Sequence, residues 1–322
     1  MSATTFPPVA APSDDSGARV RAMLTTADAG RRRTDRLVTV LVCSAFALAM
    51  IPLVSLLWTV AVRGAEKFGP YFLSVSMRGV FGGMDSGGIY HAIVGTLLIT
   101  LCAAVISVPI GLLTAIYLVE YGHGALARAT TFFVDVMTGI PSIVAGLFAY
   151  ALFAIFFGPG VRLGIAAGVA LSVLMIPVVV RSCEEMLRLV PNELREASYA
   201  LGVPRWLTII KVVLRTSVAG LTTGVLLSVA RVIGETAPIL ITAGIANSIN
   251  FNPFEGRMAT LPVFIFSQYR QGVVPCRADV ENCLVNINEL RAWAAALTLI
   301  LIVMLLNLLG RLVTRLFAPK LR

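Results

Sequence analysis

Two ionisable residues, Arg231 and Glu235, lie inside an apolar stretch of the chain and could together bind an anion. A charged side chain at the centre of a bilayer costs about 2.5–3.5 kcal/mol on insertion scales, so such residues usually face a bundle interior or a cavity. The planar guanidinium of arginine offers a fork of donors that fits phosphate oxygens. An ionised carboxylate can accept the proton of a P–OH group, which sulfate lacks. The pair therefore predicts a site for a protonated oxyanion.

A structural interpretation of the same pair stays open. In a continuous α-helix, residues i and i+4 lie on one face, so Arg231 and Glu235 could simply neutralise each other. Arginine before glutamate is the less favourable order for such a pair. Two apolar residues would also cost less than a buried ion pair. These arguments favour the anion site.

The composition indicates an integral membrane protein. Of the 322 residues, 57% are hydrophobic and only 13% are charged, whereas soluble domains carry about 25% charged residues. The net charge of +9 comes from basic residues in short runs between apolar stretches, which indicates membrane orientation rather than nucleic-acid binding. These basic residues favour the segments that face the cytoplasm when both termini lie inside.

Six segments are long and apolar enough to cross a bilayer, which needs about 20 residues per helix. They cover residues 37–62, 91–118, 132–157, 163–180, 217–241 and 293–316. We therefore predict an all-α membrane protein with six transmembrane helices over residues 37–322, preceded by a disordered cytoplasmic tail over residues 1–36. Pro141 and Pro238 are expected to break their helices near a cavity. Gly220 and Gly224 have the spacing that lets a second helix approach closely, and this could be a helix of a partner subunit.

The outer part of the chain, residues 242–292, contains two features with open interpretations. Residues 261–266 are too short to span the membrane, and they could lie at its interface or re-enter it. Cys276 and Cys283 could form a disulfide on this oxidising side, or remain two free thiols.

The inner segment between the fourth and fifth spans predicts a short helix over about residues 192–202. Asn192 is expected as its N-cap, and Gly202 as its stop, with Pro204 just beyond. Leu194, Ala197 and Leu201 would share one face of this helix. Such a helix would lie across the inner face of the membrane.

The residues Glu196, Ala197, Ser198 and Gly202 resemble the signature of ABC importer permeases, in which E-A-A is followed by three residues and glycine, and nine residues later by I-x-L-P. Here Val212 and Arg215 stand at the isoleucine and proline positions. The resemblance implies that these four residues couple the chain to a separate ATPase. None of the three lysines follows a G-x-x-x-x-G loop, so we expect a transporter subunit, not an enzyme, with ATP and Mg bound by the partner ATPase.

A second motif is similar to the PstA-type permeases of phosphate importers. Residues 230–238, A-R-V-I-G-E-T-A-P, match the A-R-x-x-G-E-T-A-P stretch of that family, and residues 139–146 and 176–181 agree with it. The resemblance implies a type I ABC importer permease fold of the MetI-like kind. It places five residues on the substrate pathway: Arg231, Glu235, Thr236, Arg181 and Ser142. Arg181 could equally be a positive-inside anchor.

The resemblance also implies partners. These are a homologous PstC-like permease that completes the anion pathway, two PstB-like ATPase subunits, and an extracellular PstS-like phosphate-binding protein, assembled at the plasma membrane with both termini of this chain cytoplasmic. Transport would proceed by alternating access. The alternatives are a permease for another oxyanion, such as sulfate or molybdate, and an ion-coupled secondary carrier.

Overall fold

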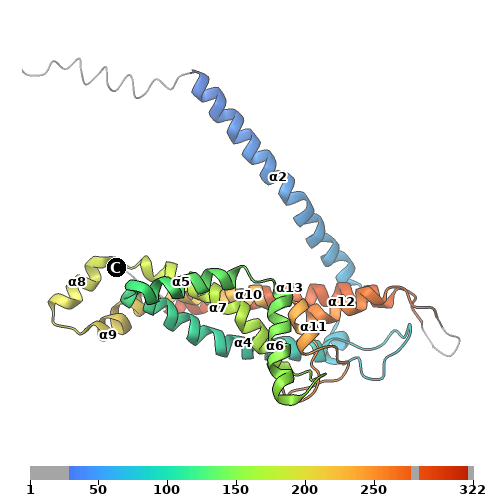
Figure 1. Cartoon of the computed structure of the whole chain (residues 1–322). Coiled ribbons are helices and arrows are strands. Elements are labelled where there is room, and N and C mark those ends of the chain that lie inside the picture. The colour runs from blue at the N-terminus through green and yellow to red at the C-terminus, as the bar shows by residue number, and fades with distance from the viewer. Residues whose placement is uncertain (1–28, 277–282, 318–322) are drawn as a thin grey trace, which may run out of the picture. The chain divides into compact units, whose positions relative to one another are not determined.

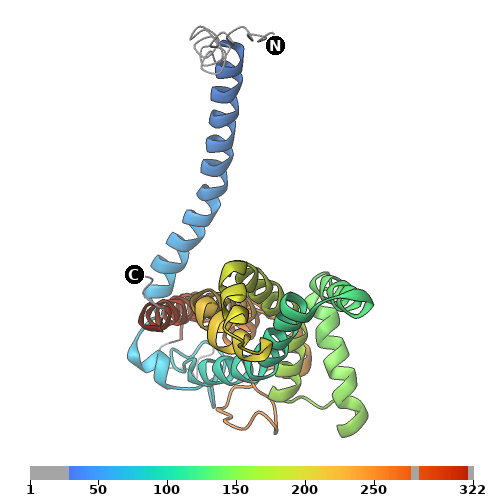
Figure 2. The same cartoon turned by 90° about the vertical axis from the view of Figure 1, so that its left-hand side faces the viewer.

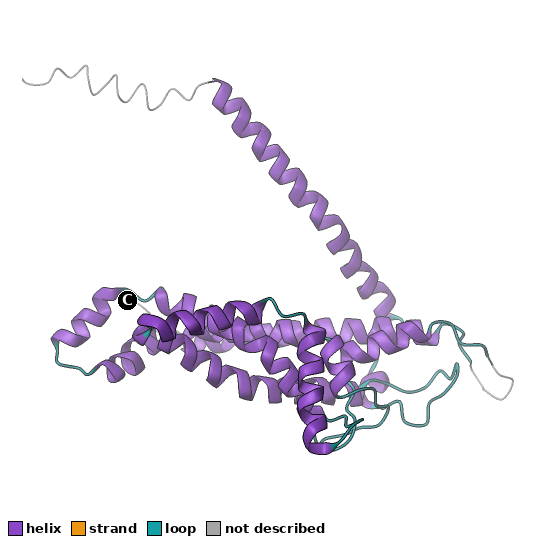
Figure 3. Cartoon of the chain, viewed as in Figure 1, coloured by secondary structure: helices purple, strands orange, loops and turns teal. Residues whose placement is uncertain are grey.

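The computed structural model of the protein describes residues 29–276 and 283–317. In this part, helices form nearly all of the regular structure (Figure 3). The chain divides into two units, residues 1–58 and residues 59–322, and each is described by itself. The predicted tail over residues 1–28 lies outside the described residues.

The first unit contains most of helix α2 (Ala29–Ala65). Residues 29–36, which were expected in the disordered tail, are the first turns of this helix. Large apolar side chains such as Leu37, Phe46 and Trp58 are exposed along it. A long helix that is apolar all round is suited to lipid rather than water.

The second unit contains all the other helices (Figure 1). In chain order these are α3 (Pro70–Ser74), α4 (Tyr90–Ile116) with the π-helical turn η1 (Tyr117–Tyr121), α5 (Gly124–Thr138), α6 (Ser142–Phe157), α7 (Gly164–Arg188), α8 (Asn192–Ala200), α9 (Arg205–Thr208) with the π-helical turn η2 (Ile209–Val213), α10 (Leu214–Val232), α11 (Ala237–Thr242), α12 (Leu261–Gln271) and α13 (Ile287–Phe317).

The number of membrane spans agrees with the sequence. Within residues 29–276 and 283–317, five helices are long and apolar enough to cross a membrane. A sixth span results if α5 and α6, which meet at an angle of 105°, count as one broken span. The predicted all-α membrane fold is confirmed.

Helix α7 is packed between α4 and α10. Small residues make this close packing possible, because a Cβ atom at Gly168 would lie 2.8 Å from the Cβ of Cys102 on α4. On the α10 side, a Cβ at Gly220 would lie 2.6 Å from Met186 Sδ, and one at Gly224 would lie 2.8 Å from Ser182 Cβ. Gly220 and Gly224 therefore pack against α7 of the same chain, not against the partner helix that was considered from the sequence.

Two helix breaks occur beside the prolines that were expected to cause them. The first separates α5 from α6 at Gly139–Pro141, and the second separates α10 from α11 at Ile233–Thr236. Proline lacks the backbone donor and disfavours helical conformation in the residue before it. Each long segment is therefore two shorter helices, and α5 and α6 meet at 105°.

Helix α12 corresponds to the short apolar segment at residues 261–266. It buries Leu261 and Phe264 against α4 and α13, and the backbone N–H of Leu261 donates to Thr96 Oγ1 of α4 at 2.8 Å. The segment is thus a part of the helix bundle, and its position at the membrane interface or within the membrane stays a prediction.

The loops at one end of the second unit are tied together. Cys276 and Cys283 form a disulfide, and Leu284 N–H donates to Gly83 O at 2.9 Å. The buried guanidinium of Arg291 donates to the backbone carbonyls of Met84 and Ser86 at 2.6 and 2.7 Å. Helices α8 and α9 lie at the opposite end of the second unit (Figure 1). Figure 2 shows the bundle viewed from this end.

The contact between α6 and α11 predicts the effect of a substitution. A Cβ atom at Gly146 would lie 2.6 Å from Pro238 Cα, so Gly146→Leu should destabilise the docking of these helices by about 3 kcal/mol. The midpoint of thermal unfolding in detergent should fall clearly. Gly139→Leu is the matched control, because a Cβ there meets only Val136 O at 3.5 Å. Equal midpoints for the two variants would contradict the close contact between Gly146 and Pro238.

Candidate functional site

The anion-site candidates lie at the break between α10 and α11. Helix α10 ends at Val232, so Arg231 lies in its last turn, while Glu235 lies in the non-helical link. Arg231 is exposed in the isolated chain, and Glu235 and Thr236 are half-buried. The break leaves backbone polar groups of the link without helical partners, which a membrane protein tolerates only where protein or a water-filled cavity covers them.

The alternative that Arg231 and Glu235 neutralise each other is wrong. The two residues do not share a helix face, because the helix ends between them. Among the described residues, neither takes part in an ion pair. Both charges are therefore free for another partner.

Helix α6 contributes the neighbouring wall of the break. Its buried face contains Ala145, Gly146 and Ala149, and Gly146 packs on Pro238 of α11. Ser142 lies one turn before Gly146 on the same face and is half-buried. The two motif segments at residues 139–146 and 230–238 thus meet in space, although they are far apart in the sequence.

A pocket of about 580 Å³ adjoins the break on the side of α12. Thr236 lines it together with Gly234 and residues of α12, including Phe266 and Tyr269. Its wall is mostly apolar, and Arg231 and Glu235 are not part of it. An anion would not be stabilised there, since the apolar wall offers few donors.

Arg181 lies elsewhere, in the C-terminal half of α7, and its guanidinium already binds two carboxylates. It forms ion pairs with Asp135 of α5 and, at 2.9 Å, with Glu184 of α7. Glu184 also binds Arg188 at 2.7 Å. These contacts join α5 to α7 and favour an anchoring role, so the place of Arg181 on the pathway stays a prediction.

The short inner helix is α8, and its ends differ in part from the expectation. Its N-cap is Pro191, and Asn192 is the first helical residue. Gly202 has a φ of +75°, and its N–H bonds to Tyr199 O at 2.9 Å while Val203 N–H bonds to Ser198 O at 3.2 Å. This pair of bonds is the Schellman motif, which favours glycine at the left-handed position. The stop predicted at Gly202 is confirmed.

The two faces of α8 have different surroundings. Leu194, Glu196, Ala197 and Leu201 are exposed, Leu201 to 83%. Ser198 is buried instead, and its hydroxyl lies 2.8 Å from Thr208 Oγ1 of α9. Ser198 therefore holds α8 against α9 and is not part of a docking surface.

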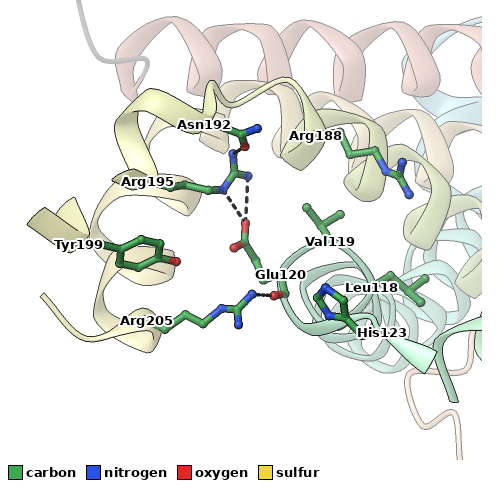
Figure 4. A pocket seen from close by; sticks show the side chains of 9 residues that line it. All are labelled: Leu118, Val119, Glu120, His123, Arg188, Asn192, Arg195, Tyr199 and Arg205. Carbon is green, nitrogen blue, oxygen red and sulfur yellow. Dashed lines mark hydrogen bonds and ion pairs between the residues drawn. The ribbon is translucent and has the colours of Figure 1, made fainter. Parts of the chain in front are cut away.

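Sequence reasoning missed the residues that hold α8 on the bundle. Glu120 in η1 is buried and binds the guanidinium of Arg195 of α8 at 2.9 Å. Both line a pocket of about 480 Å³ with Arg188, Arg205 and others (Figure 4). The available signal was an acidic residue at the inner end of an apolar segment, which is uncommon and implies a partner.

The packed apolar helices define a membrane-embedded helical bundle. The family model of binding-protein-dependent transport system inner membrane components matches residues 107–322. The phosphate transport system permease protein PstA 1 of Mycobacterium tuberculosis (strain CDC 1551 / Oshkosh) is 47% identical over 281 residues, covering 86% of this chain and 88% of the relative. PstA of Yersinia pestis is 37% identical over 294 residues, covering 91% and 92%.

The chain therefore belongs to this family of inner membrane components and, within it, to the PstA permease proteins. The resemblance inferred from its motifs is confirmed. Among solved structures, an inward-facing MetNI methionine ABC transporter structure is similar in fold, with a TM-score of 0.52 and 20% identity over 71% of this chain and 94% of the other.

The Ser198–Thr208 contact predicts how protease cleavage near α8 changes when one or both hydroxyls are removed. Thr208→Val should leave the buried Ser198 hydroxyl without a partner, which costs about 1–3 kcal/mol. The segment around α8 should then be cut faster by protease in inside-out vesicles. The double variant Ser198→Ala/Thr208→Val removes both hydroxyls and should restore protection. Equal cleavage of the single and double variants would argue against the contact.

Proposed function

We propose that this chain is the permease subunit of an ATP-driven importer of inorganic phosphate, and that it forms the anion pathway with a second, homologous permease. The observation that carries the proposal is the free arginine at a helix break, in a chain closely related to proteins named phosphate transport permeases. The chain itself is a transporter subunit and not an enzyme.

The chemistry of the break suits phosphate. The guanidinium of Arg231 can donate two parallel hydrogen bonds to phosphate oxygens. The carboxylate of Glu235 can accept the proton of a P–OH group. The hydroxyls of Thr236 and Ser142 can donate or accept, so they can adapt to either kind of oxygen.

The exposure of Arg231 supports a pathway that two chains share. An arginine facing lipid at membrane depth is costly, so a protein partner or water must cover it. A second permease against this face would enclose Arg231 in a polar channel between the two subunits.

The energy source is a separate protein. Leu194, Ala197 and Leu201 give α8 an exposed apolar face that can insert into a groove of an ATPase subunit. Two such subunits would bind ATP and Mg at the cytoplasmic side, and this chain would bind no cofactor. The disulfide end would then face outward, where thiols oxidise, toward an extracellular phosphate-binding protein. Both termini would be cytoplasmic at the plasma membrane.

The first prediction of this proposal concerns Arg231. In proteoliposomes containing the complete importer, Arg231→Ala should lower ATP-dependent uptake of radiolabelled phosphate by at least about tenfold, because charged hydrogen bonds to the ion are lost. Arg270→Ala is the matched control, since Arg270 is also an exposed arginine in the last turn of a helix. Unchanged uptake in Arg231→Ala would remove this residue from the pathway. Uptake without the ATPase would instead indicate a secondary carrier.

The second prediction concerns selectivity. Glu235→Gln replaces an obligate acceptor by an amide that can donate to a fully deprotonated oxyanion. Phosphate uptake should fall, and competition by sulfate should increase. The measurement is inhibition of phosphate uptake by sulfate in proteoliposomes, with the binding protein present at the same concentration throughout. If both quantities match the wild type, Glu235 does not select the ion.

A further inference from the structure

A buried carboxylate lies where α4 meets the inner end of the bundle. Glu120 belongs to η1, the π-helical turn that continues α4, and its side chain is 4% exposed. Single π-helical turns are rare and occur often at functional positions. Glu120 needs a charged partner, since an unpaired buried carboxylate is strongly destabilising.

Arg195 of α8 is that charged partner, and its guanidinium also binds backbone carbonyls at the end of α7. Its Nε and Nη2 atoms donate to Glu120 Oε1 at 3.1 and 2.9 Å. The same guanidinium donates to two backbone carbonyls at the end of α7. These are Leu187 O in the last turn, at 3.1 Å, and Val190 O just beyond the helix, at 2.6 Å. One side chain of α8 thus binds the inner ends of both α4 and α7.

Arg205 makes a second contact with the same turn from α9. Its guanidinium donates to the backbone carbonyl of Glu120 and lies over the ring of Tyr121, 4.8 Å from the ring centre. Figure 4 shows Arg195 and Arg205 approaching Glu120 from two sides. We call Glu120, Arg195 and Arg205 the Glu120 joint.

The order of the helices along the chain shows which of them the Glu120 joint adds to the backbone connections of α8. The backbone connects α8 directly to α7, and through α9 and η2 to α10. It does not connect α8 directly to α4, whose Glu120 is 75 positions from Arg195. The side chains of the joint supply a link from α8 to α4.

We propose that the Glu120 joint transmits movement of α8 to α4 and α7, so that Glu120, Arg195 and Arg205 are positioning residues for coupled transport. The proposal rests on the proposed function, in which an ATPase moves α8. Because α7 packs against α10, displacement of the α4–α7 pair reaches the helix that carries Arg231 in its last turn. Without the joint, α8 can move with the ATPase while α4 stays behind.

The test separates coupling from folding. The complete importer is reconstituted with wild type, Glu120→Gln, Arg195→Gln, the double variant Glu120→Gln/Arg195→Gln, and Arg205→Ala. Each is measured for retention of the ATPase subunit during purification, for ATP hydrolysis, and for phosphate taken up per ATP hydrolysed. Arg188→Gln is the matched control, since it removes a positive charge from the same pocket but breaks only an ion pair within α7.

The double variant decides between a structural and a coupling role. Removing both partners avoids an uncompensated buried charge, so this variant should assemble better than either single variant. If the joint transmits movement, the double variant retains the ATPase and hydrolyses ATP, yet its uptake per ATP stays at least about fivefold below the wild type. Arg205→Ala, at an exposed position, should show a smaller loss in the same direction.

Three outcomes are distinguishable. If both the double variant and Arg205→Ala take up as much phosphate per ATP as the wild type, the Glu120 joint does not transmit movement. The Glu120–Arg195 pair then serves only local packing. An equal loss in Arg188→Gln also overturns this role of the joint, since the effect would then come from pocket charge. If the wild-type complex itself shows no ATP-driven phosphate uptake, the proposed function fails.

Discussion

The close packing of α7 against α4 and α10 is the constraint on which the other features depend. Glycine and alanine residues let these helices approach closely, and in lipid such packing replaces the hydrophobic driving force that holds soluble bundles together. Arg231 lies in the last turn of α10, and Glu120 lies in η1, which continues α4. Helix α7 therefore packs against both the helix that carries Arg231 and the helix that leads to Glu120.

The arginines of this bundle divide by what they contact. Arg181 and Arg195 bind carboxylates, and Arg291 binds the carbonyls of Met84 and Ser86. Their charges are consumed in joining helices and loops. Arg231 has no ion-pair partner among the described residues, although it is equally costly to place in a membrane. Its charge is therefore free to bind a ligand.

The helix breaks are placed where the bundle can cover them. Gly146 of α6 meets Pro238 of α11, so one broken helix covers part of the other. This mutual contact limits the exposure of unpaired backbone groups to lipid. It also means that the two motif segments are coupled by direct packing at the breaks.

The sequence by itself determined the membrane setting, the family, the helix breaks at Pro141 and Pro238, and the stop at Gly202. These features depend on composition, on local backbone chemistry or on short motifs, all of which a single segment contains. Only the tertiary structure decided that Gly220 and Gly224 face α7, that Ser198 points inward, and that Arg181, Arg195 and Arg291 are bound. The partners of these arginines lie 46, 75 and 207 positions away, and no local pattern specifies which distant segments come into contact.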